Sequence, residues 1–182
     1  MKVIPAAPAL VILIGPTGAG KSTWAAKHFT EDEVIDTDAV RIEFGEARGM
    51  SRDNLATLFK SVWETEEQQI IEEYHRRIKA GIDDEKRVVA EASHLRKEVR
   101  LKVANIGLTC NVPVIYVVFD RPREDKLKTA GWRAEAPIIN GLGIIDRYAK
   151  RFEANEADIL CGDNISTITV IDTRSEGYHV VP

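Results

Sequence analysis

The stretch Gly15-Pro16-Thr17-Gly18-Ala19-Gly20-Lys21-Ser22-Thr23 decides the fold of this 182-residue chain. It fits the pattern G-x-x-x-x-G-K-[ST], which is the phosphate-binding loop, or P-loop. An apolar and largely β-branched segment, residues 10–14, precedes it, and a segment of helical composition, residues 24–29, follows it. A strand, a glycine-rich loop and a helix in this order surround a triphosphate with backbone N–H groups at the positive end of the helix. The stretch therefore predicts a nucleotide-binding α/β domain.

The loop is expected to bind ATP or another nucleoside triphosphate, and two of its side chains have specific tasks. Lys21 is placed to reach the β- and γ-phosphates, and the hydroxyl of Ser22 is placed to hold Mg²⁺. The predicted nucleotide-binding residues are Gly15, Thr17, Gly18, Ala19, Gly20, Lys21, Ser22 and Thr23.

The composition is that of an ordinary globular protein, with 44% hydrophobic and 30% charged residues. We expect a single domain over residues 1–182, because this length suits one hydrophobic core. The formal net charge of −4 argues against a broad basic coat for duplex nucleic acid. The net charge does not argue against a local basic cleft.

The cysteines and the apolar start of the chain bear on its location. Cys110 and Cys161 have no metal-binding spacing, and two reduced thiols in the cytoplasm are the plain interpretation. Pro5 and Pro8 interrupt the apolar start, and no run approaches the roughly 18 apolar residues of a membrane span. We therefore expect a cytoplasmic protein without a membrane segment, and the oligomeric state stays open.

Segments of strand and helix character alternate along the chain. The predicted strands are residues 10–14, 33–36, 87–91, 112–120 and 167–172. The predicted helices are residues 24–29, one opening at Asp38 as its N-cap, 51–80 ending at Gly81, 97–108, 123–128 and 138–152. Residues 129–137 are a predicted loop. This alternation predicts a P-loop α/β fold, with a parallel sheet covered by helices on both faces.

A P-loop alone leaves the fate of the γ-phosphate open. A GTPase switch would need a base-reading motif such as Asn-Lys-x-Asp, and the chain has none. A motor or AAA-type ATPase is usually larger and has a strand ending in Asp-Glu, whereas the best candidate strand here ends in a single acid, Glu91. A small kinase needs a base for the acceptor hydroxyl and an arginine for the transition-state charge.

Asp38 is the candidate base. It follows the second predicted strand, at the carboxyl edge where ligands bind in open α/β sheets. The simpler interpretation of Asp38 is that it only caps a helix. Asp36 is a competing carboxylate, but as the last residue of the predicted strand it is better placed for an inward or structural role. Arg41 lies three residues beyond Asp38, so the two share a helix face, as a site pair or as a surface ion pair.

At this point the residues resemble a known family. The pattern Gly-x-x-Gly-x-Gly-Lys-Ser-Thr-Trp followed by a strand and Asp-x-x-Arg is similar to the kinase module of phage and bacterial polynucleotide 5′-kinases. The resemblance implies that Asp38 is the general base and that Arg41 contacts the acceptor phosphate. The family continues with Asp-x-Thr-Asn, where this chain has Glu91-Ala92-Ser93-His94. Direct equivalence of Glu91 and His94 therefore does not follow.

Further marks of this family follow downstream. Phe119-Asp120-Arg121-Pro122 matches a family strand end, and the resemblance places the essential lid arginine at Arg133, within a lid of residues 129–137. Thr129 stands where the family has a second lid arginine, and Pro137 also fits the pattern. The likeness runs from Leu10 to Phe152, without the phosphatase or ligase domains of the family, which implies kinase activity alone.

The expected function is an ATP-dependent polynucleotide 5′-hydroxyl kinase that acts on DNA or RNA ends, with catalytic residues Lys21, Asp38, Arg41 and Arg133. The expected acceptor-binding residues are Asp38, Arg41, Glu91, Arg96 and Arg100. Arg96, Lys97 and Arg100 cluster at the start of one predicted helix, where a solvated face is the alternative. Trp132 is a candidate for stacking on adenine or an end base, or else an anchor of the lid.

Two other functions remain open. A small-molecule kinase of the same fold would phosphorylate a sugar, an antibiotic or a nucleotide-sugar. The nucleotide-sugar alternative is the one suggested by a resemblance to zeta-type toxins. A small-molecule kinase would also use the P-loop, an Asp base and lid arginines, and would differ in the acceptor channel. A nucleotide-dependent binding module without turnover is the second alternative, against which the Asp38-x-x-Arg41 pair argues.

Overall fold

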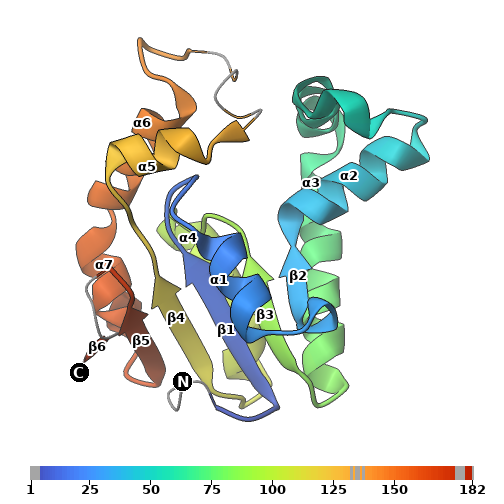
Figure 1. Ribbon diagram of the computed structural model, residues 1–182. Helices are drawn as coiled ribbons and strands as arrows, with labels where there is room; N and C mark the ends of the chain where they lie inside the picture. The colour runs from blue at the N-terminus through green and yellow to red at the C-terminus, as the bar shows by residue number, and fades with distance from the viewer. Residues whose placement is uncertain (1–4, 132, 134–135, 137, 175–178, 182) are drawn as a thin grey trace.

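The computed structural model describes residues 5–131, 133, 136, 138–174 and 179–181. One sheet of six strands forms its centre, in the order β2-β3-β1-β4-β5-β6 (Figure 1). The strands are β1 (Ala9–Ile14), β2 (Val34–Asp36), β3 (Arg87–Glu91), β4 (Val114–Val118), β5 (Ile168–Asp172) and β6 (His179–Val181). The first five run parallel, which confirms the predicted α/β fold class. The antiparallel β6 was not predicted.

Seven α-helices are described. They are α1 (Lys21–His28), α2 (Thr37–Ala47), α3 (Leu55–Asp83), α4 (Lys97–Thr109), α5 (Arg123–Lys128), α6 (Ile144–Glu153) and α7 (Glu156–Leu160). Short 3₁₀ turns are η1 (Glu31–Glu33), η2 (Arg52–Asn54) and η4 (Gly162–Asn164). Within the described part of the chain, no helix is long and apolar enough to cross a membrane.

Both faces of the sheet are buried, as the unbroken apolar run of β1 requires. On one face, Leu10 and Ile12 of β1 pack with Tyr74 of α3 and Val103 of α4. On the other face, alternate residues of the same strands pack against Trp24 of α1 and its neighbours. A third cluster joins α2 to the start of α3, and its buried members are Val40, Leu58, Val62 and Ile70.

Three predicted helix ends are wrong. Helix α3 continues through Gly81 to Asp83, because a side chain at position 81 would collide with Val88 and glycine lets the helix pack closely on β3. Helix α6 begins at Ile144 rather than at residue 138, since Ile139 and Leu142 close a tight turn before it. Asp38 lies inside α2, whose N-cap is Asp36.

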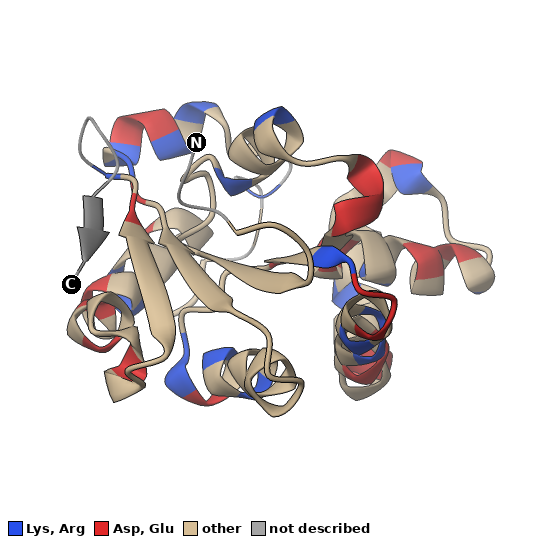
Figure 2. Ribbon diagram, turned by 90° about the horizontal axis from the view of Figure 1, so that it is seen from below, with Lys and Arg blue, Asp and Glu red and all other residues tan. Residues whose placement is uncertain are grey.

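Charged side chains in the described strands lie at strand ends, while the middle of the sheet is uncharged (Figure 2). Asp36, Glu91 and Asp172 are the last residues of β2, β3 and β5. Asp36 and Glu91 are direct register partners. Because parallel strands end at the same edge, these carboxylates and the P-loop after β1 meet there. Figure 1 shows α2 and the start of α3 on one side of this edge, and α5 and α6 on the other.

Candidate active site

The P-loop joins β1 to α1 and is closely covered by the segment after β4. Gly18 and Gly20 have φ values of +79° and +95°, which other residues adopt only with strain. A side chain at Gly18 would come within 2.7 Å of the carbonyl oxygen of Lys126, and one at Gly20 would collide with the guanidinium of Arg121. Arg121 therefore lies against the P-loop, a contact that the sequence did not single out.

Lys21 is folded back onto its own loop. Its ammonium group donates hydrogen bonds to the carbonyl oxygens of Gly15 at 2.9 Å and Pro16 at 3.0 Å. Burial lowers the pKa of Lys21 to about 8, against the opposing effect of nearby carboxylates led by Glu91. A buried ammonium held by neutral carbonyls would gain from the charge of a phosphate.

Ser22 and Glu91 form the candidate metal position. The hydroxyl of Ser22, at the start of α1, donates a hydrogen bond to the Oε1 atom of Glu91 at the end of β3. Hydroxyl and carboxylate oxygens are ligands that Mg²⁺ prefers, and this ion commonly takes its other ligands from phosphates and water. The described residues contain no group of three or more His, Cys, Asp or Glu side chains that could hold a metal ion.

Asp38 brings together residues from both sides of the sheet edge. Its Oδ1 atom accepts a hydrogen bond at 2.9 Å from Arg41, one turn further along α2. Its Oδ2 atom accepts a hydrogen bond from Arg133, 95 residues away in the predicted lid. Asp38, Arg41 and Arg133 thus form one cluster.

Asp36 is less suited to the role of base than Asp38. Its side chain caps α2 by accepting a hydrogen bond from the backbone N–H of Asp38 at 2.9 Å. Burial, together with the nearby charges of Asp38 and Glu91, raises the pKa of Asp36 to about 7. A capping carboxyl in this setting serves structure first, whereas the Asp38 side chain is 29% exposed and contacts two arginines.

Arg41 has a second carboxylate partner that the sequence analysis missed. Its Nε and Nη2 atoms donate to the two carboxylate oxygens of Glu67, at 3.2 Å and 2.6 Å. Glu67 lies in the middle of α3, where the sequence indicated only a polar stretch. This paired geometry fixes the guanidinium in one orientation. Arg41 is consequently buried and holds the carboxylate of Asp38 from one side.

His94 is a buried link between elements below the site. Its Nδ1 atom donates to the carbonyl oxygen of Leu13 at 2.8 Å, because a carbonyl can only accept. Its Nε2 atom therefore accepts from the Tyr74 hydroxyl, 3.1 Å away. Burial lowers the pKa of His94 to about 4, so the ring is neutral at physiological pH. His94 fastens the loop after β3 to β1 and α3.

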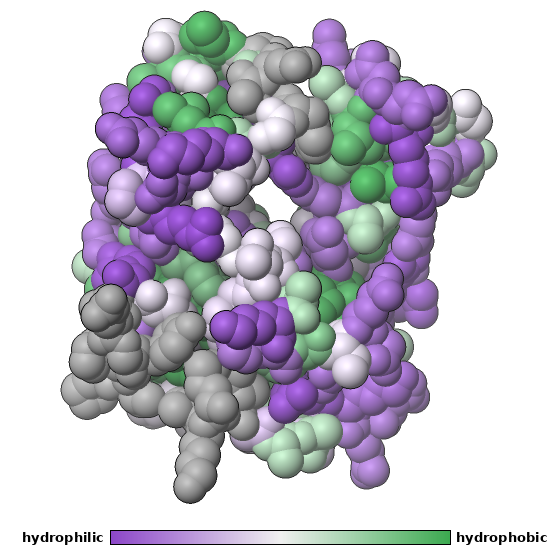
Figure 3. Space-filling model, in the orientation of Figure 1, coloured by the Kyte–Doolittle hydropathy of each residue, from purple (hydrophilic) through white to green (hydrophobic). Residues whose placement is uncertain are grey.

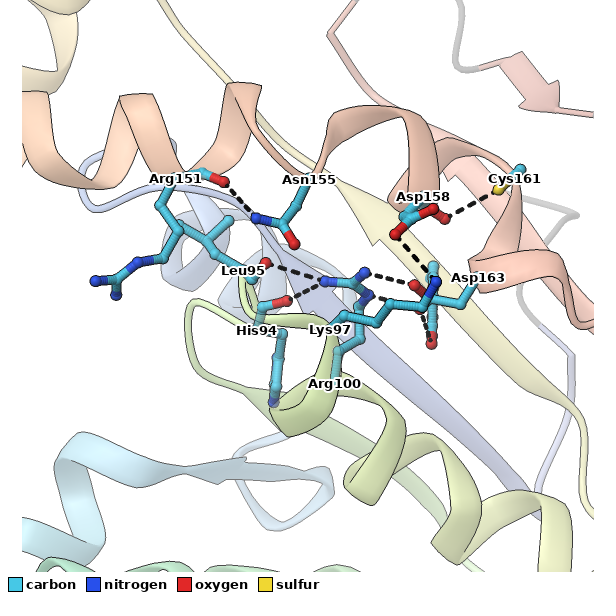
Figure 4. A network of polar contacts seen from close by, with 10 residues as sticks. His94, Leu95, Lys97, Arg100, Arg151, Asn155, Asp158, Cys161 and Asp163 are labelled. Carbon is cyan, nitrogen blue, oxygen red and sulfur yellow. Dashed lines mark hydrogen bonds and ion pairs between the residues drawn. The ribbon is translucent and has the colours of Figure 1, made fainter.

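The structure contradicts the prediction that Arg100 binds the acceptor. Arg100 is fully buried and binds both carboxylate oxygens of Asp163, at 2.7 Å and 2.6 Å (Figure 4). It also donates to the carbonyl oxygens of His94 and Leu95. Position 100 lies on the inner face of α4, and its partner in η4 is 63 residues away, so the sequence spacing gave no warning.

The rest of the predicted basic cluster is divided. Lys97 pairs with Asp158 of α7 at 3.0 Å, a contact drawn beside the buried one in Figure 4. Arg96, the N-cap of α4, is exposed. Three cations were predicted to contact the phosphate backbone of the acceptor. Arg100 is buried and Lys97 is paired, so Arg96 is the exposed cation of the three.

Asp163→Asn is expected to destabilise the fold by about 3–5 kcal/mol, because it leaves the Arg100 charge buried without its counter-ion. Asparagine tolerates the backbone of position 163, where φ is +56°, so the loss reports the charge. Urea unfolding measures the change. The control is Asp158→Asn, whose exposed pair with Lys97 is worth about 0–1 kcal/mol. Equal losses in both variants would contradict a special role for the buried pair.

The described part of the predicted lid begins against the P-loop. The hydroxyl of Thr129 lies 3.3 Å from the carbonyl oxygen of Gly18. Trp132 and Pro137, which carried predictions about stacking and the lid boundary, lie outside the described residues. Figure 3 shows an opening through the molecule between the side that carries α5 and the side that carries α2. The ion pair between Arg133 and Asp38 joins these two sides.

The fold and the site together define a P-loop α/β domain of the kinase-like type. The chain belongs to the family described as AAA domain (AAA_33), whose model matches residues 10–154. The match includes the P-loop, the carboxylates that end β2 and β3, and Arg133. Membership in this family establishes the P-loop domain. A search of curated proteins gives no significant match.

Solved structures share the fold at low sequence identity. A chain of the Pnkp1/Rnl/Hen1 RNA repair complex is 20% identical, with a TM-score of 0.61 over 86% of this chain and 47% of that one. A chain of AvrRxo1-ORF1:-ORF2 with ATP is 12% identical, with a TM-score of 0.65 over 96% and 57%. A chain of the PezAT toxin–antitoxin system of Streptococcus pneumoniae is 16% identical, with a TM-score of 0.58 over 92% and 67%.

This chain spans about half the length of the first two of these proteins. At such identities the likeness concerns the fold. It confirms the P-loop kinase resemblance at that level.

Proposed function

We propose that the protein is a kinase that transfers the γ-phosphate of ATP, or of another nucleoside triphosphate, to the 5′-hydroxyl end of DNA or RNA. The observation that carries the proposal is the position of Asp38. Its carboxylate lies at the carboxyl edge of the sheet, where the P-loop follows β1. Arg41 and Arg133 of the predicted lid both donate hydrogen bonds to it. A base and a mobile arginine beside a P-loop are the parts that phosphoryl transfer requires.

Each residue has a defined part in this mechanism. The P-loop N–H groups receive the phosphates, and Lys21 exchanges its carbonyl partners for the β- and γ-phosphate oxygens. Ser22 and Glu91 would hold Mg²⁺, which supplies positive charge to the phosphate oxygens. Asp38 takes the proton of the acceptor hydroxyl as the new P–O bond forms. The bond between the γ-phosphorus and the bridging oxygen breaks, and ADP leaves.

In this mechanism Arg133 changes partners. In the structure Arg133 pairs with Asp38. Arg133 occupies the Oδ2 atom of Asp38, so the acceptor and the triphosphate must draw Arg133 away before the hydroxyl can reach that oxygen. The released guanidinium then stabilises the charge on the transferring phosphoryl group. The base is thus freed when a substrate is present to use it.

The choice of acceptor rests on the Asp38-x-x-Arg41 pattern and on the exposed Arg96. One specific observation favours the second candidate, a small-molecule kinase. Arg41 already binds Glu67, and Arg100 is buried, so two cations predicted to follow a phosphate backbone are engaged elsewhere. The free donors that remain on Arg41 suit one phosphate at most.

An acceptor screen tests the proposal. ATP labelled in the γ-phosphate is incubated with 5′-hydroxyl DNA and RNA strands, sugars, nucleotide-sugars and antibiotics. We expect label on the 5′-hydroxyl ends. We expect Lys21→Ala to abolish it without loss of the fold, because the ammonium bonds to P-loop carbonyls and Lys21 is not part of the apolar clusters.

Label on a sugar or nucleotide-sugar alone would favour the small-molecule kinase. ATP binding without any labelled product would favour the binding module. Substantial turnover in Lys21→Ala would contradict the role of the P-loop.

A further inference from the structure

Trp63 is an exposed indole one side chain away from the candidate base. It lies on α3 and is 51% exposed, unusually high for so large an aromatic residue. The guanidinium carbon of Arg41 lies over its ring, 5.4 Å from the centroid. The same guanidinium donates to Asp38 at 2.9 Å. Two contacts therefore connect the indole to the carboxylate.

Helix α3 explains this position. Tyr74, Glu67 and Trp63 are spaced by seven and four residues, so they share one face of the helix. Tyr74 is buried against His94 below the sheet edge, and Glu67 binds Arg41 at the level of the site. Trp63 lies one turn further out. Along this face the surroundings change from core to site to solvent.

Packing does not account for Trp63. The apolar cluster between α2 and α3 has Val40, Leu58, Val62 and Ile70 as its buried members and Ile42, Phe44, Met50 and Phe59 at its margin. Trp63 is absent from both sets. Its ring is instead oriented by Arg41, which covers part of it and leaves half of the residue open to solvent.

The charges around the ring indicate which group it would receive. Arg41 is neutralised by Glu67 and Asp38, and Arg48 lies 3.6 Å from Glu66. A further phosphate would meet these carboxylates, whereas an uncharged planar ring would not be repelled. Aromatic side chains accept any nucleobase, because every base has a π-face.

We propose that Trp63 stacks on the nucleobase of the terminal nucleoside of the acceptor. The inference rests on the proposed function and deepens it, since it assigns a base-binding surface beside Asp38. With the 5′-hydroxyl at Asp38, the terminal base extends past Arg41 onto the open part of the indole. Stacking is indifferent to base identity, so this surface would bind any terminal nucleoside.

The test compares two acceptors and three proteins. One acceptor is a 5′-hydroxyl oligonucleotide, and the other is the same strand with an abasic terminal nucleotide. For the unchanged protein, we expect the abasic end to raise KM about 5- to 100-fold, the range of base–aromatic stacking. Trp63→Ala should raise KM for the normal end by a similar factor and remove the difference between the two acceptors. Trp63→Phe, which keeps an aromatic face, should restore most of the difference.

A binding measurement separates stacking from a fault in turnover. The oligonucleotide should quench tryptophan fluorescence, and Trp63→Phe should lose most of that quenching while KM for ATP stays unchanged. Equal KM differences between the acceptors in Trp63→Ala and in the unchanged protein would overturn the stacking role and leave the proposed function standing.

Two other outcomes also count against the inference. If the protein phosphorylates no 5′-hydroxyl end, the proposed function fails and the stacking role fails with it. If a sugar is the acceptor and Trp63→Ala raises its KM, the indole supports a sugar ring, and the nucleobase assignment is wrong.

Discussion

Arg133→Ala is expected to lower kcat by about 10³–10⁵-fold, the range found for arginines that act on a transferring phosphoryl group. Arg133 pairs with Asp38, and its charge also acts on Lys21 of the P-loop, so we expect its guanidinium to reach a γ-phosphate bound there. Its removal also frees Asp38 from one ion pair. Easier access to the base would raise kcat, but we expect the loss of transition-state charge stabilisation to lower it by more. Steady-state kinetics with saturating acceptor measures the change.

The matched control for Arg133 is Arg123 of α5. Arg123 pairs with Asp146 on the surface, and its side chain is 60% exposed, so Arg123→Ala should change kcat only slightly. Arg133→Lys is a second, sharper comparison, since lysine keeps the charge and loses the planar fork. We expect it to recover part of the activity. Equal losses for Arg123→Ala and Arg133→Ala would contradict the assignment of Arg133 to the site.

Asp38→Ala is expected to lower kcat by about 10²–10⁴-fold, the usual contribution of a positioned base, with ATP binding nearly unchanged. The carboxylate is the group that Arg41 and Arg133 both address, and no P-loop hydrogen bond involves it. Single-turnover kinetics with bound ATP isolates the transfer step. The loss should be smaller at higher pH, where the acceptor hydroxyl needs less assistance from a base.

Asp36→Asn is the control for Asp38, because asparagine is as good an N-cap as aspartate. It keeps the hydrogen bond to the backbone N–H of residue 38, so α2 should begin at the same place. We expect activity close to that of the unchanged protein. An inactive Asp36→Asn beside an active Asp38→Ala would show that the base is Asp36, whose pKa of about 7 is itself suited to proton transfer.

Local patterns were enough for the nucleotide half of the site and for most of the sheet. The P-loop is contiguous, and its geometry follows from glycines and a helix start within nine residues. Strands β1, β3 and β4 are buried on both faces and consist of short apolar runs, so their identity as strands was predictable. The short spacing from Asp38 to Arg41 placed both on one turn of α2.

Helix ends and partner choice were less accessible. Gly81 carries the usual signal for a helix end, yet it serves close packing on Val88, and only the neighbouring strand makes that visible. Arg100 has the sequence surroundings of an exposed basic cluster. Its burial depends on Asp163 and two backbone carbonyls, which accept from the guanidinium, and on the Tyr116 hydroxyl, which donates to Asp163.

The tertiary structure also decided how the candidate base is held. Glu67 is 26 residues from Arg41, and Arg133 is 95 residues from Asp38, so no local pattern predicts these ion pairs. They form because α2 and the start of α3 lie on one side of the carboxyl edge of the sheet and α5 lies on the other (Figure 1), so residues far apart in the sequence meet at that edge. Short-range patterns thus determined the P-loop half of the candidate site. Long-range packing decided the half proposed to bind the acceptor, because its charges come from elements that meet only in the folded chain.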